Sequence, residues 1–107
     1  MTTHTLSEAD KGRLVPGIHF MDEPAGRCAK VPGTGLGVWE VIQGYIERCD
    51  HDEHLLAREY DWLSSAQLRA ALDYYGLFPA EIEARLALED RYTPGYLREL
   101  FGDRFIG

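Results

Sequence analysis

The segment that decides the fold reads Val38-Trp-Glu-Val-Ile-Gln-Gly-Tyr-Ile-Glu-Arg-Cys49. Its apolar side chains recur at intervals of three and four residues, which is the period of one face of an α-helix. Glu40, Gln43 and Glu47 fall on the opposite side. We therefore expect an amphipathic helix here, with its apolar face packed into a small core.

The residues after this segment predict two helices joined by a tight turn. Asp50 or Asp52 can cap a short helix over residues 53–60, because aspartate accepts hydrogen bonds from the free amides of a helix start. Ser64 or Ser65 can cap a third helix that runs to about Gly76. This spacing has the size of a helix-turn-helix unit.

Two further helices are expected beyond Gly76. Pro79–Asp90 predicts a fourth helix, since proline is tolerated in the first turn. Thr93-Pro94 predicts the start of a short last helix, in which Leu97, Leu100 and Phe101 form an apolar stripe.

The pattern before Val38 is different. Short apolar pieces between Leu14 and Gly37 are separated by proline and glycine, which indicates two strands joined by a turn near Asp22–Gly26. Since an isolated hairpin is barely stable, these strands must pack on the helices or pair with a partner.

These patterns predict a mainly α fold: a short N-terminal β-hairpin followed by a helix-turn-helix-containing bundle of four to five helices. The chain of 107 residues has the size of one domain. We expect a flexible N-terminal arm at residues 1–12, the helix-turn-helix domain at 13–90 and a helical extension at 91–107.

The composition favours a cytoplasmic protein. Apolar residues make up 45% of the chain, too many for a disordered polymer, yet no apolar run approaches the roughly 20 residues of a membrane span. The N-terminus lacks the basic and apolar regions of a signal peptide. Cys28 and Cys49 are too few for a disulfide scaffold and fit a reducing compartment.

The net charge is −7, from 18 acidic and 11 basic residues. This balance argues against a protein that coats nucleic acid without specificity, because phosphate contacts need lysine and arginine. It leaves open a local basic surface, and four cations stand in the N-terminal third of the chain: Lys11, Arg13, Arg27 and Lys30.

The third predicted helix supplies the candidate binding residues. In a helix-turn-helix the second helix reads DNA with its N-terminal residues, which here are Ser64, Ser65, Gln67 and Arg69. An ordinary helical hairpin is the competing interpretation. Leu68, Ala71, Leu72 and Tyr75 would form its buried face. Helix–helix contact with a partner or a second copy would then use Ala66, Ala70 and Tyr74.

No residue pattern indicates catalysis or a cofactor. Cys49, His51 and His54 could bind a transition metal, but no second cluster completes a tetrahedral site, so we expect none. Pro32–Gly37 matches neither common phosphate-binding loop, and a tight turn with a local Thr34 hydrogen bond is the simpler interpretation. Trp39 and Trp62 are interpreted as core anchors.

Three pieces of the sequence resemble the bacterial and archaeal family called domain of unknown function 433. They are Val31-Pro-Gly-Thr-Gly-Leu-Gly-Val38, Leu56-Ala-Arg-Glu-Tyr60 followed by Leu63, and Gln67-Leu-Arg-Ala-Ala-Leu-Asp-Tyr-Tyr75 continued by Glu81-Ile82. The resemblance implies a small, dimeric helix-turn-helix domain with an N-terminal β element. Some relatives are classed as antitoxins of the VapB type, encoded beside nuclease-like toxins of the PIN type. Gly35 stands where the family usually has arginine, which removes a candidate phosphate or partner contact.

Two functional hypotheses follow. The first is a homodimeric, antitoxin-like module that binds operator DNA, a PIN-type nuclease toxin, or both. The second is a dimeric protein-interaction or structural module that does not bind DNA, which the charge of −7 favours. A small metal-dependent enzyme would depend on Cys49, His51 and His54 alone.

Overall fold

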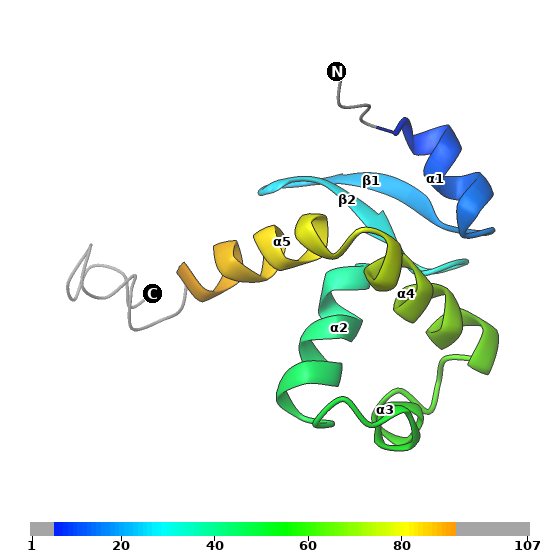
Figure 1. The fold of residues 1–107 in the computed structure, drawn as a ribbon, viewed down its shortest axis with the longest axis vertical. Coiled ribbons are helices and arrows are strands. Elements are labelled where there is room, and N and C mark those ends of the chain that lie inside the picture. Colours follow the sequence, from blue (N-terminus) through cyan, green and yellow to red (C-terminus); the bar gives the residue numbers. More distant parts are fainter. Residues whose placement is uncertain (1–5, 92–107) are drawn as a thin grey trace.

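The computed structural model of the chain describes residues 6–91, in which five helices and one β-hairpin form a mainly α fold (Figure 1). The predicted fold class is confirmed. The elements are α1 (Glu8–Leu14), β1 (His19–Glu23), β2 (Gly26–Lys30), α2 (Val38–Glu47), α3 (Glu53–Glu59), α4 (Ser65–Leu77) and α5 (Pro79–Arg91). The predicted extension beyond Arg91 lies outside the described residues.

Helix α1 occupies a stretch that we expected to be part of a flexible arm. Ser7 Oγ accepts a hydrogen bond from Asp10 N (3.1 Å), and the Asp10 carboxylate accepts one from Ser7 N (3.4 Å), which together form a capping box. No residue of α1 is fully buried. Because α1 buries none of its residues, its sequence has no periodic apolar pattern from which a helix could be predicted. The capping residues Ser7 and Asp10 were the one signal for it.

The predicted hairpin is confirmed, with its turn at Pro24 and Ala25. Strands β1 and β2 pair antiparallel from His19↔Lys30 to Glu23↔Gly26. One face of the hairpin packs on the helices, where Phe20 meets the ring of Tyr74 edge-on at 6.3 Å between centroids. The helices thus stabilise a hairpin that would not be stable alone.

Helix α2 forms the centre of the core, as its sequence pattern predicted. Val38, Val41 and Ile42 are completely buried, and α2 packs against β2, α3, α4 and α5. Its first turn is capped by its own side chain, since Gly37 N donates to Glu40 Oε2 (2.8 Å).

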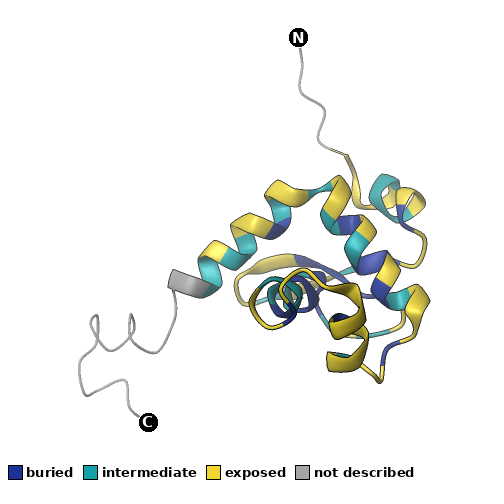
Figure 2. Cartoon of the chain, turned by 60° about the horizontal axis from the view of Figure 1, so that its bottom comes forward, coloured by how far each residue is buried: buried dark blue, intermediate teal, exposed yellow. Residues whose placement is uncertain are grey.

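Helices α2 and α4 turn their buried positions inward, whereas α3 is almost wholly exposed (Figure 2). Leu56 is the one residue of α3 that reaches the core. Helix α3 lies at the end of the molecule opposite the hairpin (Figure 1). No helix in the described part of the chain is long and apolar enough to cross a bilayer.

Candidate partner-binding surface

Helices α3 and α4 and the turn between them form the expected helix pair. Asp52 Oδ1 caps α3 by accepting from His54 N (2.8 Å) and Leu55 N (3.3 Å). The turn closes through Leu63 N, which donates to Tyr60 O (2.9 Å). Figure 1 shows α3 end-on while α4 runs across the view, so the two helices cross rather than run side by side.

Two of the four candidate DNA contacts are used in building α4. Ser64 Oγ accepts from Gln67 N (3.1 Å), and Gln67 Oε1 accepts from Ser64 N (2.8 Å), which makes a capping box. Gln67 Nε2 also donates to Pro32 O (2.8 Å), which ties α4 to the loop before α2. These side chains stabilise the fold, and reading a base edge would break their hydrogen bonds.

The other two candidates are exposed, but Arg69 is neutralised. Its guanidinium contacts the carboxylates of Glu53, on α3, and Asp73, one turn further along α4 (3.8 Å). Ser65 is exposed, and no protein hydrogen bond engages its side chain in the described residues. The start of α4 therefore presents one free hydroxyl and a paired arginine.

Only one of the three residues predicted to contact a partner is exposed. Ala66 is exposed, whereas Ala70 is buried and Tyr74 is completely buried. Tyr74 packs on Phe20 and Phe78, and its hydroxyl donates to Glu81 Oε2 (2.5 Å). Burial, reinforced by Glu81, raises the pKa of the Tyr74 hydroxyl above its usual value. Ala70 and Tyr74 are core residues and cannot contact a partner.

A groove of about 470 Å³ lies between α3 and α4. Its apolar lining includes Leu56, Leu63 and Leu68 of the core, together with the half-buried Leu72. The exposed alanines are Ala57 on α3 and Ala66 on α4, and the ion-paired Glu53 and Arg69 also line the groove. The sequence reading placed Leu72 in the core and did not identify the groove, because only the crossing of the two helices creates it.

Trp62, in the turn between these helices, is 62% exposed. The prediction that it anchors the core is wrong. Its ring lies 6.1 Å from that of Tyr60, and Leu55 on α3 is also exposed. Trp39 is half-buried beneath the guanidinium of Arg85, 4.3 Å from the ring centroid. Aromatic side chains are enriched where proteins bind one another, so the exposed Trp62 is a candidate contact residue.

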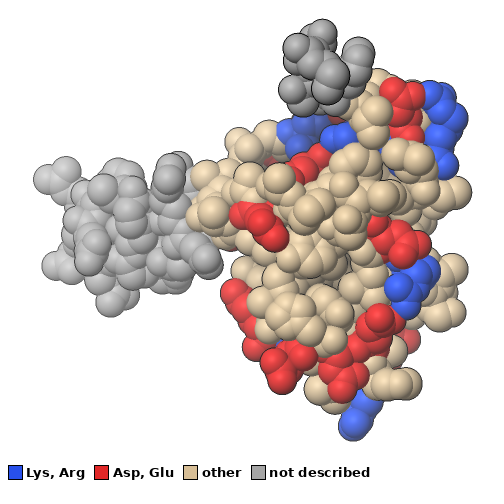
Figure 3. Space-filling model, viewed as in Figure 1, with Lys and Arg blue, Asp and Glu red and all other residues tan. Residues whose placement is uncertain are grey.

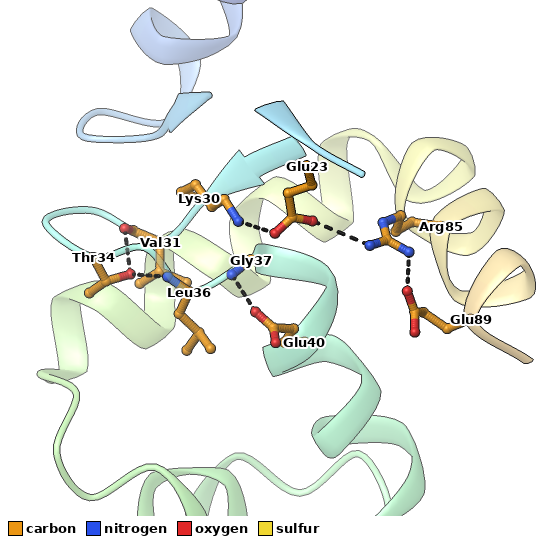
Figure 4. Close-up of polar contacts among 9 residues, drawn as sticks. All are labelled: Glu23, Lys30, Val31, Thr34, Leu36, Gly37, Glu40, Arg85 and Glu89. Carbon is orange, nitrogen blue, oxygen red and sulfur yellow. Dashed lines mark hydrogen bonds and ion pairs between the residues drawn. The ribbon is translucent and has the colours of Figure 1, made fainter. Parts of the chain in front are cut away.

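A second polar cluster joins the hairpin to α5 (Figure 4). Glu23 accepts from the buried Lys30 and from Arg85 (3.3 Å), and Arg85 also pairs with Glu89. The Lys30 ammonium holds the pKa of Glu23 at about 2, with further help from Cys28 and Arg85. A cavity of about 210 Å³ beside this cluster is lined by Cys28, Trp39, Arg85 and apolar residues of β2 and α5. Because each charge already has a partner, the cluster joins the two elements electrostatically.

The four N-terminal cations, which left a local basic surface open, all have acidic partners among the described residues. Lys11 pairs with Glu81 (2.5 Å), Arg13 with Asp10, and Arg27 with Glu8 (2.8 Å) and Asp22 (3.2 Å), while Lys30 is buried against Glu23. The sequence placed these cations close together but gave no information on their acidic partners.

The residues considered as metal ligands are not arranged as a site. Cys49 is buried, which raises the pKa of its thiol, whereas His51 and His54 are exposed. Among residues 6–89, whose side chains the structure describes, no three His, Cys, Asp or Glu side chains are grouped so that they could hold a metal ion. These positions form the connection between α2 and α3.

The glycine-rich loop before α2 is a closed turn. Thr34 Oγ1 donates to Val31 O (2.9 Å) and accepts from Leu36 N (3.0 Å), so the predicted local hydrogen bond is present (Figure 4). The Glu40 carboxylate already occupies the start of α2, where a phosphate would bind.

Comparison of the chain with models of protein families, with curated proteins and with solved structures finds no match.

Proposed function

We propose that the chain is a cytoplasmic, antitoxin-type protein-interaction module, which acts by binding another protein and has no catalytic role. The observation that carries the proposal is the α3–α4 face. It combines an apolar groove, an exposed tryptophan in the connecting turn and an arginine neutralised by two carboxylates. These features suit a protein partner better than a polyanion. The resemblance to relatives encoded beside PIN-type nuclease toxins suggests a toxin as that partner.

Co-expression with the protein encoded by the adjacent gene tests this function. We expect a stable complex in size-exclusion chromatography with light scattering, and inhibition of the neighbour if it is a nuclease. A nuclease neighbour that stays separate and fully active at micromolar concentrations of both proteins would refute the antitoxin function. The same measurement on the isolated chain tests the predicted homodimer.

Operator binding is the second candidate. The crossing of α3 and α4 and the exposed Ser65 at the start of α4 favour it, because a helix-turn-helix presents that end of its second helix to the major groove. Its distinguishing test is binding of the chain to its own upstream DNA at low salt.

A further inference from the structure

We propose that the groove between α3 and α4 binds a basic amphipathic helix of the partner protein. The inference rests on the proposed protein-binding function, and it specifies the chemistry of the partner and the residues that contact it. The apolar stripe of the partner helix lies over Leu72 and the exposed Ala57 and Ala66, and its lysines and arginines face the acidic surroundings of the groove.

The shape of the groove suits a helix. It has a volume of about 470 Å³ and is lined by residues of both α3 and α4. Ala57 on one side and Ala66 on the other are exposed and small, so the backbone of a third helix can approach both α3 and α4 closely. Helices that bind in such grooves insert apolar side chains spaced three and four residues apart.

The charge around the groove selects a basic occupant. Residues 48–77 contain six acidic side chains and three arginines, a net charge of −3, and one of these arginines, Arg48, pairs with Glu59. Figure 3 shows acidic side chains concentrated on the part of the molecule that carries α3, with few basic ones among them. Arg69 is paired with Glu53 and Asp73, so these three groups together leave a single negative charge beside the groove. A partner rich in lysine and arginine is therefore attracted to this face, and its approach is accelerated at low salt.

Other occupants lack this complementarity. Duplex DNA is a polyanion and is repelled by the same carboxylates. A second copy of the chain carries a net charge of −7. The segment 92–107 of this chain contains Arg98 and Arg104 but also Glu99 and Asp103, so it offers no excess of positive charge.

The probe is a synthetic peptide of about five helical turns, with leucines at helical spacing on one face and lysines elsewhere. Titration into the isotopically labelled full chain should shift the amide resonances of α3 and α4, and raising the salt should weaken binding. Two control peptides separate charge from shape: one with glutamate in place of every lysine, and one of the same composition with a scrambled order. We expect at least roughly tenfold weaker binding for each.

Variants of the chain locate the site. Ala66→Tyr and, independently, Ala57→Tyr fill the groove from opposite sides without changing its charge, and each should weaken peptide binding by about tenfold or more. Ala87→Tyr makes the same change on an exposed position of α5 and should bind normally. Glu53→Lys should weaken binding, whereas Asp22→Lys, an equal change of charge in the hairpin, should not. Thermal unfolding verifies that each variant is folded.

Shifts outside α3 and α4, equal binding of the glutamate peptide, or insensitivity to both groove-filling variants would overturn the proposal. Self-association of the labelled chain through α3 and α4 would identify a second copy as the occupant and would also overturn it. Ala66→Tyr in the co-expression experiment separates the protein-interaction function from the assignment of the groove as its contact. If the complex with the neighbouring gene's product still forms with this variant, the groove is not the contact, and the protein-interaction function still stands.

Discussion

Glu23 connects three elements, because its carboxylate accepts from Lys30 in β2 and Arg85 in α5 while its backbone belongs to β1. Lys30 is 3% exposed, so its charge is removed from water and depends on Glu23 for compensation. Breaking such a buried pair by removing one partner typically costs about 3–5 kcal/mol. The position of the hairpin on α5 is therefore sensitive to the ionisation of a single carboxyl group.

We predict that the fall in the free energy of unfolding at acid pH depends on Glu23. The pKa of this carboxyl lies at about 2 in the fold, below its usual 4.5, so its contribution is complete above pH 4.5 and disappears as the pH falls towards 2. The corresponding loss is about 3 kcal/mol in the free energy of unfolding. Glu23→Gln should be less stable at neutral pH and should lose less stability on acidification, as measured by urea unfolding at several pH values.

A second variant keeps this prediction testable if Glu23→Gln does not fold. Glu23→Gln/Lys30→Met removes both buried charges at once, and replacing a buried ion pair by neutral groups is often tolerated. If the double variant loses as much unfolding free energy on acidification as the wild-type protein does, other carboxylates control acid unfolding.

Gly17 is expected to be the least replaceable glycine of the turn before β1. Its φ is +93°, and a Cβ at this position would meet Pro32 Cβ at 2.8 Å, so alanine adds both backbone strain and a steric clash. We expect Gly17→Ala to lower the free energy of unfolding by about 2–3 kcal/mol in urea titrations.

Two other glycines separate these contributions. Gly26 has a φ of +125° with open space around it, so Gly26→Ala should cost only the backbone strain, about 1–2 kcal/mol. Gly35 has neither constraint, and Gly35→Ala should stay within about 0.5 kcal/mol of the wild type. Equal effects at Gly17 and Gly26 would show that Pro32 moves away at little cost.

At the scale of elements, the sequence predicted those with a clear period or a cap. Helix α2 was recognised from its apolar face, and α3 and α4 from Asp52 and Ser64, which do cap them. The buried face of α4 was only partly predicted: Leu68 and Ala71 are buried as expected, but Ala70 and Tyr74 are buried in place of Leu72 and Tyr75. Apolar residues occur on nearly every side of α4, so its period does not choose a face. Packing against α2 and α5 makes that choice.

Helix α1 is the element most dependent on ionic contacts. It has no buried residue, and Lys11 fastens it by pairing with Glu81 (2.5 Å) and lying 5.1 Å from the ring centroid of Phe78. Glu8 adds a second contact through two hydrogen bonds from Arg27. An element with few apolar contacts opens locally at low free-energy cost.

We predict that Lys11→Met loosens α1 without unfolding the domain. Removing the ion pair and the cation–π contact should reduce the protection of the amides of residues 8–14 by roughly tenfold in hydrogen exchange, equivalent to about 1.4 kcal/mol. The amides of α2 should keep their protection. Arg13→Met is the control, because Arg13 is exposed and, among the described side chains, pairs only with Asp10 of the same helix. Equal loosening in both variants would show that the contact with Glu81 does not fasten α1.

At the scale of the whole molecule, the surface available to a charged partner depends on which charges are paired more than on the net charge. Seven of the eight lysines and arginines with described side chains form ion pairs, and Arg58 is the exception. The sequence supplied the total of −7 but not the pairs, since partners such as Lys11 and Glu81 are 70 residues apart. For the same reason the candidate site was predicted as single residues of α4, whereas the groove needs Ala57, Leu63 and Leu72 together.

We predict that the wild-type chain has no specific affinity for its upstream DNA, even at low salt, because Arg69 is held by Glu53 and Asp73. Glu53→Gln/Asp73→Asn releases this arginine and should create weak, salt-sensitive DNA binding, about fivefold above the wild type for one phosphate contact worth about 1 kcal/mol. Adding Arg69→Ala to this double variant should abolish the gain. Fluorescence anisotropy of labelled duplexes measures all three proteins. Specific binding by the wild type that Arg69→Ala weakens about tenfold would show that the ion pairs open on contact with DNA, and operator binding would then replace protein binding as the function of α4.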